Sequence, residues 1–195
     1  MKVRIILRNS LYLLLILKNI YVSTIYSQSD TSMIFWREDR PITWEDFRGN
    51  IPYKKGKIAA EIAVGLTYGS NRYKGYTVIF DIYAFMDRQE SWTKLKKDSF
   101  ALKHEQVHFD IAELYARKLR KKLNGKKIRF SRYVKYESSM FKKYQKKMVK
   151  YQLLYDKKTE RGCNPTEQIK WNERIAKELK LSEKYKNPEV RVILK

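Results

Sequence analysis

Apolar and polar residues alternate through GYTVIFDIYAFM, residues 75–86. This period of two is typical of a β-strand with one face on a hydrophobic core. The preceding segment IAAEIAVGLTYG, residues 58–69, is also strand-like, and the connector between them carries the Asn and Gly of a loop. We therefore predict a β-hairpin across residues 58–86, preceded by a turn-rich, aromatic segment at residues 34–57.

From Trp92 onward the apolar period is that of a helix. Apolar residues recur at helical spacing up to the stop pair Asn-Gly at residues 124–125. A second helix is predicted at about residues 133–155, and the run NPTE at residues 164–167 supplies the N-cap, N1 and N3 residues of a third. The predicted fold is α+β: an N-terminal antiparallel sheet or hairpin, then three helices.

The N-terminus resembles a secretory leader. It begins MKVRIILRNS, with basic residues and no acid, and continues with an apolar run at residues 11–17. A bilayer-spanning helix needs about 20 apolar residues, so this run is too short. We predict a signal peptide at residues 1–27 and a single domain at residues 28–195, secreted or held in the periplasm or cell envelope. Lys18, directly after the run, leaves an uncleaved interfacial anchor as the alternative.

Charge narrows the class of partner. The chain holds 43 Lys and Arg against 21 Asp and Glu, a formal net charge of +22. This excess suits an anionic envelope polymer, a membrane surface or nucleic acid, and it also suits a solvated, lysine-rich surface. Export argues against nucleic acid, so we predict no nucleic-acid partner. The single cysteine, Cys163, excludes an intramolecular disulfide.

The chemistry concentrates in HEQVH, residues 104–108, which holds both histidines of the chain. Residues four apart share one helix face, so His104 and His108 can both reach one Zn²⁺ at about 2.0–2.1 Å. Glu105 lies about 100° round the helix, where it suits a general base acting on water. We interpret the motif as a catalytic zinc site; the alternative is two helix-surface histidines that match the pattern by chance.

A catalytic zinc site normally has three protein ligands, and no third histidine exists here. Asp110 and Glu113 project away from the ligand face of the predicted helix. The segment YDKKTERGCNP offers Asp156, Glu160 and Cys163 as candidates for the third position. The sequence leaves all three open.

Four segments together resemble a bacterial family catalogued as domain of unknown function 922, described as predicted secreted zinc-dependent proteases. They are RPITWEDFRGNIP, KIAAEIAVGLTY, HEQVHFDIAELYARKLRKKL and YDKKTERGCNPTEQIKWNERI, and they extend over about residues 40–179. The resemblance implies a small zincin-like fold, secretion and a protease activity. In the family pattern a His commonly stands where this chain has Arg161, and a guanidinium has no lone pair for a metal.

Two functions remain open. The first is a secreted zinc-dependent metallopeptidase with a peptide or protein substrate, bound in extended form by a strand of the predicted hairpin. The second is a catalytically impaired metal-binding protein, or a basic interaction protein of the cell envelope with an anionic polymer or membrane surface as partner.

Overall fold

The computed structural model of the chain describes residues 32–53, 56, 58–69 and 71–195. The predicted signal peptide at residues 1–27 lies outside these described residues and stays a prediction. No helix in the described part has the length and apolar composition needed to cross a membrane.

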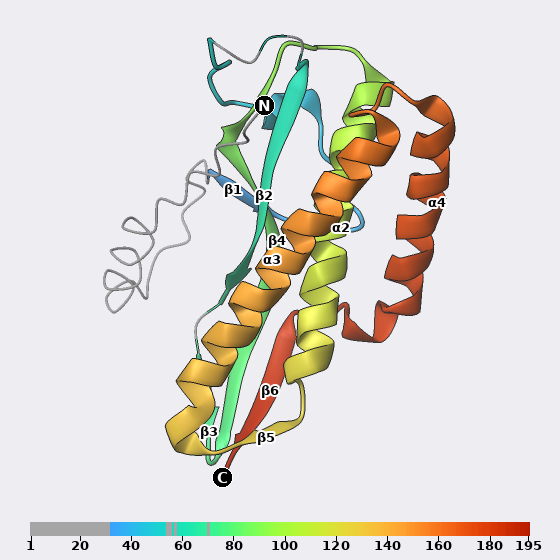
Figure 1. The fold of residues 1–195 in the computed structure, drawn as a ribbon. Coiled ribbons are helices and arrows are strands. Elements are labelled where there is room, and N and C mark those ends of the chain that lie inside the picture. Colours follow the sequence, from blue (N-terminus) through green and yellow to red (C-terminus); the bar gives the residue numbers. More distant parts are fainter. Residues whose placement is uncertain (1–31, 54–55, 57, 70) are drawn as a thin grey trace. The chain divides into compact units, whose positions relative to one another are not determined.

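The described chain forms one mixed sheet and three α-helices (Figure 1). The strands are β1 (Met33–Phe35), β2 (Ala60–Tyr68), β3 (Arg72–Lys74), β4 (Thr77–Thr93), β5 (Lys126–Ile128) and β6 (Glu189–Leu194). The α-helices are α2 (Ser99–Leu123), α3 (Tyr133–Thr159) and α4 (Pro165–Leu181). Short 3₁₀ helices are η1 (Trp44–Asp46), η2 (Phe130–Arg132) and η3 (Glu183–Tyr185).

The long strand β4 organises the sheet. Its alternating residues Val78, Phe80, Ile82 and Met86 are fully buried, which confirms the side-chain pattern read from the sequence. β2 and β3 pair with it antiparallel, as expected for the predicted hairpin, and β1 and β6 also pair with it antiparallel. This alternation gives the sheet one face that packs against helices.

The α+β prediction is confirmed, but a purely N-terminal antiparallel sheet was wrong. β6, from the C-terminal end of the chain, joins the sheet beside β4, and β5 pairs with β6 in parallel. A parallel pair needs a long crossover connection, which α3 and α4 supply here. The sheet is therefore mixed: β5 follows α2 in the chain, and β6 follows all three helices.

Helix α2 lies against the sheet and carries α3 and α4 on its other sides (Figure 1). It begins at its N-cap Asp98, whose side chain accepts from the amides of Phe100 and Ala101 at 2.9 Å each. Helix α4 begins as predicted, because Asn164 caps it through the amide of Glu167 at 3.1 Å. The N-terminal ends of α2 and α4 are thus determined by local hydrogen bonds to their N-cap side chains.

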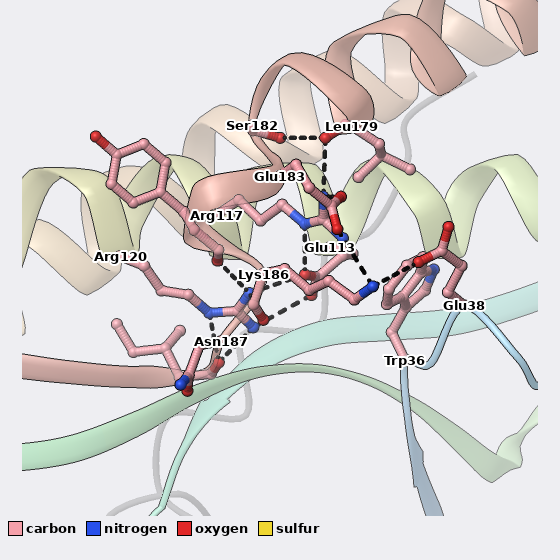
Figure 2. Close-up of polar contacts among 12 residues, drawn as sticks. Trp36, Glu38, Glu113, Arg117, Arg120, Leu179, Ser182, Glu183, Lys186 and Asn187 are labelled. Carbon is pink, nitrogen blue, oxygen red and sulfur yellow. Dashed lines mark hydrogen bonds and ion pairs between the residues drawn. The ribbon is translucent and has the colours of Figure 1, made fainter.

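A buried charge cluster ties the C-terminal segment to α2 (Figure 2). Glu113 Oε1 accepts from Arg117 Nε at 2.9 Å and from Arg120 Nη1 at 2.8 Å. Arg120 also donates to the carbonyl of Ile82 in β4, at 2.6 Å, and Arg117 donates to the carbonyl of Leu179 in α4, at 2.8 Å. One carboxylate on α2 therefore organises two arginines that hold the sheet and α4.

Candidate metal centre

The residues of HEQVH lie on α2, where that helix is covered. His104, Glu105 and His108 are 5%, 6% and 8% exposed, so all three are buried. Tyr155 of α3 covers both imidazoles: its ring stacks on His104 at a centroid distance of 4.7 Å and meets His108 edge-on at 4.9 Å. These three side chains are therefore not on the solvent-exposed surface of the helix.

Asp156, from the last turns of α3, completes a group that can hold a metal ion. Its Oδ1 lies 2.8 Å from His108 Nε2 and 3.3 Å from His104 Nε2. One ligand atom from each of the three residues lies within 4.8 Å of the other two. Two histidines and a carboxylate are a donor set used by catalytic zinc sites, so these residues fit the metal.

The other candidates for the third position are not brought into this group. Cys163 is exposed, and Glu160 accepts a hydrogen bond from Asn164 Nδ2 at 3.3 Å. Asp110 and Glu113 point elsewhere, as predicted: Asp110 accepts from Trp36 Nε1 at 2.8 Å, and Glu113 belongs to the arginine cluster. Of the residues described, His104, His108 and Asp156 are the set that converges.

Electrostatics couple the three side chains. Burial alone would raise the pKa of Asp156, but hydrogen bonds and charge interactions with both histidines outweigh it and hold that pKa far below its ordinary value. Burial alone would lower the pKa of His108, but Asp156 and the charge of Glu105 raise it. A proton on His108 would therefore compete with any bound metal, while Asp156 stays anionic.

Glu105 is hydrogen-bonded to the sheet and interacts electrostatically with the two histidines. Its Oε2 accepts a hydrogen bond from the amide of Ile62 in β2 at 3.2 Å, beside an irregularity in the pairing of β2 with β4. Burial raises the pKa of Glu105, against the lowering effect of the two histidines. A carboxylate whose pKa is moved toward neutrality is better matched to general-base work near pH 7.

Two backbone amides on the outer edge of β2 already donate hydrogen bonds to side chains. Ile62 donates to Glu105, and Leu66 donates to Gln145 Oε1 of α3 at 3.2 Å. An extended peptide that adds to this edge must replace both acceptors. The geometry therefore does not favour the predicted strand addition along the whole of β2.

The loop between α3 and α4 lies against His104. Glu160, Arg161 and Gly162 have φ values of 51°, 57° and 82°, in the left-handed region. A Cβ at Gly162 would lie 3.2 Å from Cγ of His104, a tight contact, and the left-handed φ of Gly162 also favours glycine. Arg161 lines a shallow hollow that also takes in Asp156.

Sequence reasoning missed Tyr155 and Gln168. Gln168 Oε1 lies 2.9 Å from His104 Nδ1, and Tyr155 donates its hydroxyl to the carbonyl of His104 at 3.2 Å. A signal for Gln168 existed: it shares the buried, apolar face of α4 with Trp171 and Ile175. A glutamine on such a face indicates a buried partner.

The fold and the site define an α+β protein whose HExxH-bearing helix meets a carboxylate from a second helix. Residues 84–162 match the model of a family described as "Bacterial protein of unknown function (DUF922)". This confirms the resemblance predicted from the sequence, and the matched span contains every residue of the candidate metal group. No curated protein and no solved structure matches the chain.

We expect Arg161→His to strengthen zinc binding by about tenfold or more, which is about 1.4 kcal/mol. Position 161 borders the same hollow as Asp156, and its left-handed backbone suits His better than most residues. Competition with a chromophoric chelator measures the change. Lys158→His, on the exposed side of α3, is the control and should leave the affinity unchanged. An unchanged affinity in Arg161→His would show that a side chain at position 161 does not reach the metal.

Proposed function

We propose that the protein is a zinc-dependent peptide hydrolase, a small zincin-like metallopeptidase domain. The observation that carries the proposal is the convergence of His104 Nε2, His108 Nε2 and Asp156 Oδ1 beside the buried carboxylate of Glu105. This combination provides three metal ligands and a base in one buried place, which a structural histidine pair does not need.

Each residue has a distinct part in this proposal. His104, His108 and Asp156 would hold Zn²⁺, which when bound lowers the pKa of water and polarises a carbonyl group. Glu105 takes the proton of the attacking water on its carboxylate and returns it to the leaving amine. Tyr155 excludes solvent from the two imidazoles by packing against both.

The proposed setting is outside the cytoplasm. The leader-like residues 1–27 support secretion or retention in the periplasm or cell envelope, with a peptide or protein as substrate. Zinc chemistry of this kind needs no partner protein.

Metal analysis tests the proposal. We expect about one zinc per chain in protein purified without added metal, and loss of that zinc in His104→Ala and Asp156→Ala. Loss of a residue that hydrogen-bonds to a metal ligand typically weakens metal binding by roughly 10–100-fold. Removing a ligand itself should weaken zinc binding by more than this. Glu160→Ala is the matched control, since this carboxylate lies one turn from Asp156 but outside the group. Equal zinc in the wild type and in His104→Ala would refute the site.

A specific surface favours a second candidate function, docking to an anionic membrane. None of the exposed residues of α3 is acidic. Four exposed apolar side chains, Val134, Val149, Leu153 and Leu154, lie among its lysines. The exposed lysines are Lys135, Lys142, Lys143, Lys146, Lys147, Lys150, Lys157 and Lys158. A cationic face with apolar side chains suits a bilayer surface that carries anionic lipids.

Vesicle binding tests this candidate. Each lysine near an anionic bilayer contributes about 1 kcal/mol, so replacing Lys142, Lys146 and Lys150 by Glu should weaken binding by roughly 100-fold or more. Cosedimentation with phosphatidylglycerol vesicles at low and high salt measures it. Equal binding to neutral phosphatidylcholine vesicles would exclude the electrostatic mechanism. Stronger retention by a soluble polyanion than by anionic vesicles would identify an envelope polymer as the partner instead.

A further inference from the structure

The orientation of the Gln168 amide determines which nitrogen of His104 carries a proton. Gln168 Nε2 donates to Asn172 Oδ1 at 2.7 Å and to the Tyr155 hydroxyl at 2.6 Å. Its Oε1 therefore faces His104 Nδ1, at 2.9 Å, and an amide oxygen only accepts. In this amide orientation the proton of the hydrogen bond is on Nδ1 of His104, and Nε2 of the same ring faces Asp156.

His108 also directs Nε2 at Asp156, but within the described chain its Nδ1 lacks the hydrogen-bond acceptor that His104 has. Its Nε2 faces Asp156, and its Nδ1 is buried with no hydrogen-bond partner among the described residues. The side chain of Gln152 interacts with this ring and raises the pKa of His108, and Nε2 of Gln152 is likewise buried and unpartnered in the described part of the chain. Gln152 precedes Asp156 by four residues on α3, so both side chains lie on the helix face that meets His108.

Nδ1 of His108 and the side-chain amide of Gln152 can form a hydrogen bond if that amide is flipped by about 180°. The oxygen and nitrogen of an amide occupy nearly the same positions, and no second partner holds Nε2 of Gln152 in place among the described residues. Turned, Gln152 would present Oε1 to a proton on Nδ1 of His108. Without such an acceptor, a buried N–H at that position would carry the cost of an unsatisfied donor.

We propose that Gln168 and Gln152 are positioning residues that each accept the Nδ1 proton of one histidine, so that both imidazoles present Nε2 to the metal. This inference rests on the proposed metal site and adds the two residues that orient its ligands. A hydrogen bond to the second ring nitrogen fixes the tautomer and the ring orientation of a histidine ligand. Here two neutral glutamines on different helices perform that task.

Zinc affinity and histidine NMR test the proposal together. We expect Gln168→Leu and Gln152→Leu to weaken zinc binding by about 10–100-fold each. Gln168→Glu and Gln152→Glu keep an acceptor oxygen and should restore the affinity to within a few-fold of the wild type. Gln145→Leu is the matched control, because Gln145 lies on α3 and accepts from Leu66, away from the histidines. It should leave zinc affinity unchanged.

Long-range ¹H–¹⁵N spectra report the tautomers directly, and the chain contains only two histidines to resolve. Wild-type protein should show a proton on Nδ1 of His104 without metal and on Nδ1 of both rings with zinc. Gln168→Leu should lose the fixed tautomer of His104, with thermal melting used to confirm that the variant is folded.

Two results would overturn the proposal: no proton on Nδ1 of His104 in the metal-free wild type, or unchanged zinc affinity in both leucine variants. Failure of the metal site itself is distinguishable from these. In that case the wild type would bind no zinc, while the metal-free tautomer of His104 would still decide the role of Gln168.

Discussion

Glu105→Gln will remove peptide hydrolysis while zinc stays bound. The amide keeps the size of the side chain and an oxygen that can accept from Ile62, but it cannot accept a proton from water. General-base catalysis is typically worth 10²–10⁴-fold, so the turnover rate should fall by about that factor. Cleavage of a fluorogenic peptide library, measured beside zinc content, checks both parts of the expectation.

The same substitution should not destabilise the fold. Because burial raises the pKa of Glu105, the folded protein holds that proton more tightly than the unfolded chain does. Stability therefore falls as the pH rises from the ordinary pKa of a glutamate through the raised one, and a neutral Gln removes this loss. We expect equal or higher stability at pH 7, together with lost activity.

Glu160→Gln is the control for this experiment. Glu160 lines the hollow beside Asp156 but does not belong to the metal group, so its removal should leave the rate within a few-fold of the wild type. Normal hydrolysis by Glu105→Gln would exclude Glu105 as the base. Loss of zinc in that variant would instead make Glu105 a ligand.

Glu113→Gln will destabilise the protein by about 3–5 kcal/mol. The change leaves Arg117 and Arg120, which are 1% and 3% exposed, as buried cations without their shared carboxylate. Domains of this size are stable by roughly 5–15 kcal/mol, so the loss is a large share of the total. Urea unfolding followed by circular dichroism measures the free energy of unfolding.

An exposed ion pair in the same region supplies the comparison. Glu38 pairs with Lys186 at 2.8 Å, but its side chain is 67% exposed (Figure 2). Glu38→Gln should therefore cost less than about 1 kcal/mol. A similar small loss in Glu113→Gln would mean that water reaches the arginine cluster. The cluster matters to function because it anchors the helix that carries His104 and His108.

Local features of the molecule followed from the sequence. The alternation in β4, the N-cap at Asn164 and the shared helix face of His104 and His108 each depend on residues within one or two turns. Such patterns reflect backbone geometry that repeats along every strand or helix. They allowed the α+β fold, the two candidate histidine ligands and the candidate base to be predicted.

Contacts between segments far apart in the chain could not be predicted from the sequence. β6 lies beside β4 although their paired residues, such as Thr77 and Ile193, are more than a hundred positions apart in the chain, and Gln168 lies 64 residues from the histidine it contacts. Neither pairing leaves a periodic signal, because each depends on how α3 and α4 pack against α2. The parallel pair of β5 and β6 was missed for the same reason.

The sequence by itself determined that His104, Glu105 and His108 lie together on one helix, and it narrowed the third ligand to three residues. Only the tertiary structure shows that Asp156 is the candidate that meets the two histidines. An uninterrupted helix would place Glu160 one turn beyond Asp156 on the same face, but α3 ends at Thr159 and Glu160 turns left-handed. The helix end therefore carries Glu160 and Cys163 away from the histidines, while the packing of α3 on α2 brings Asp156 to them.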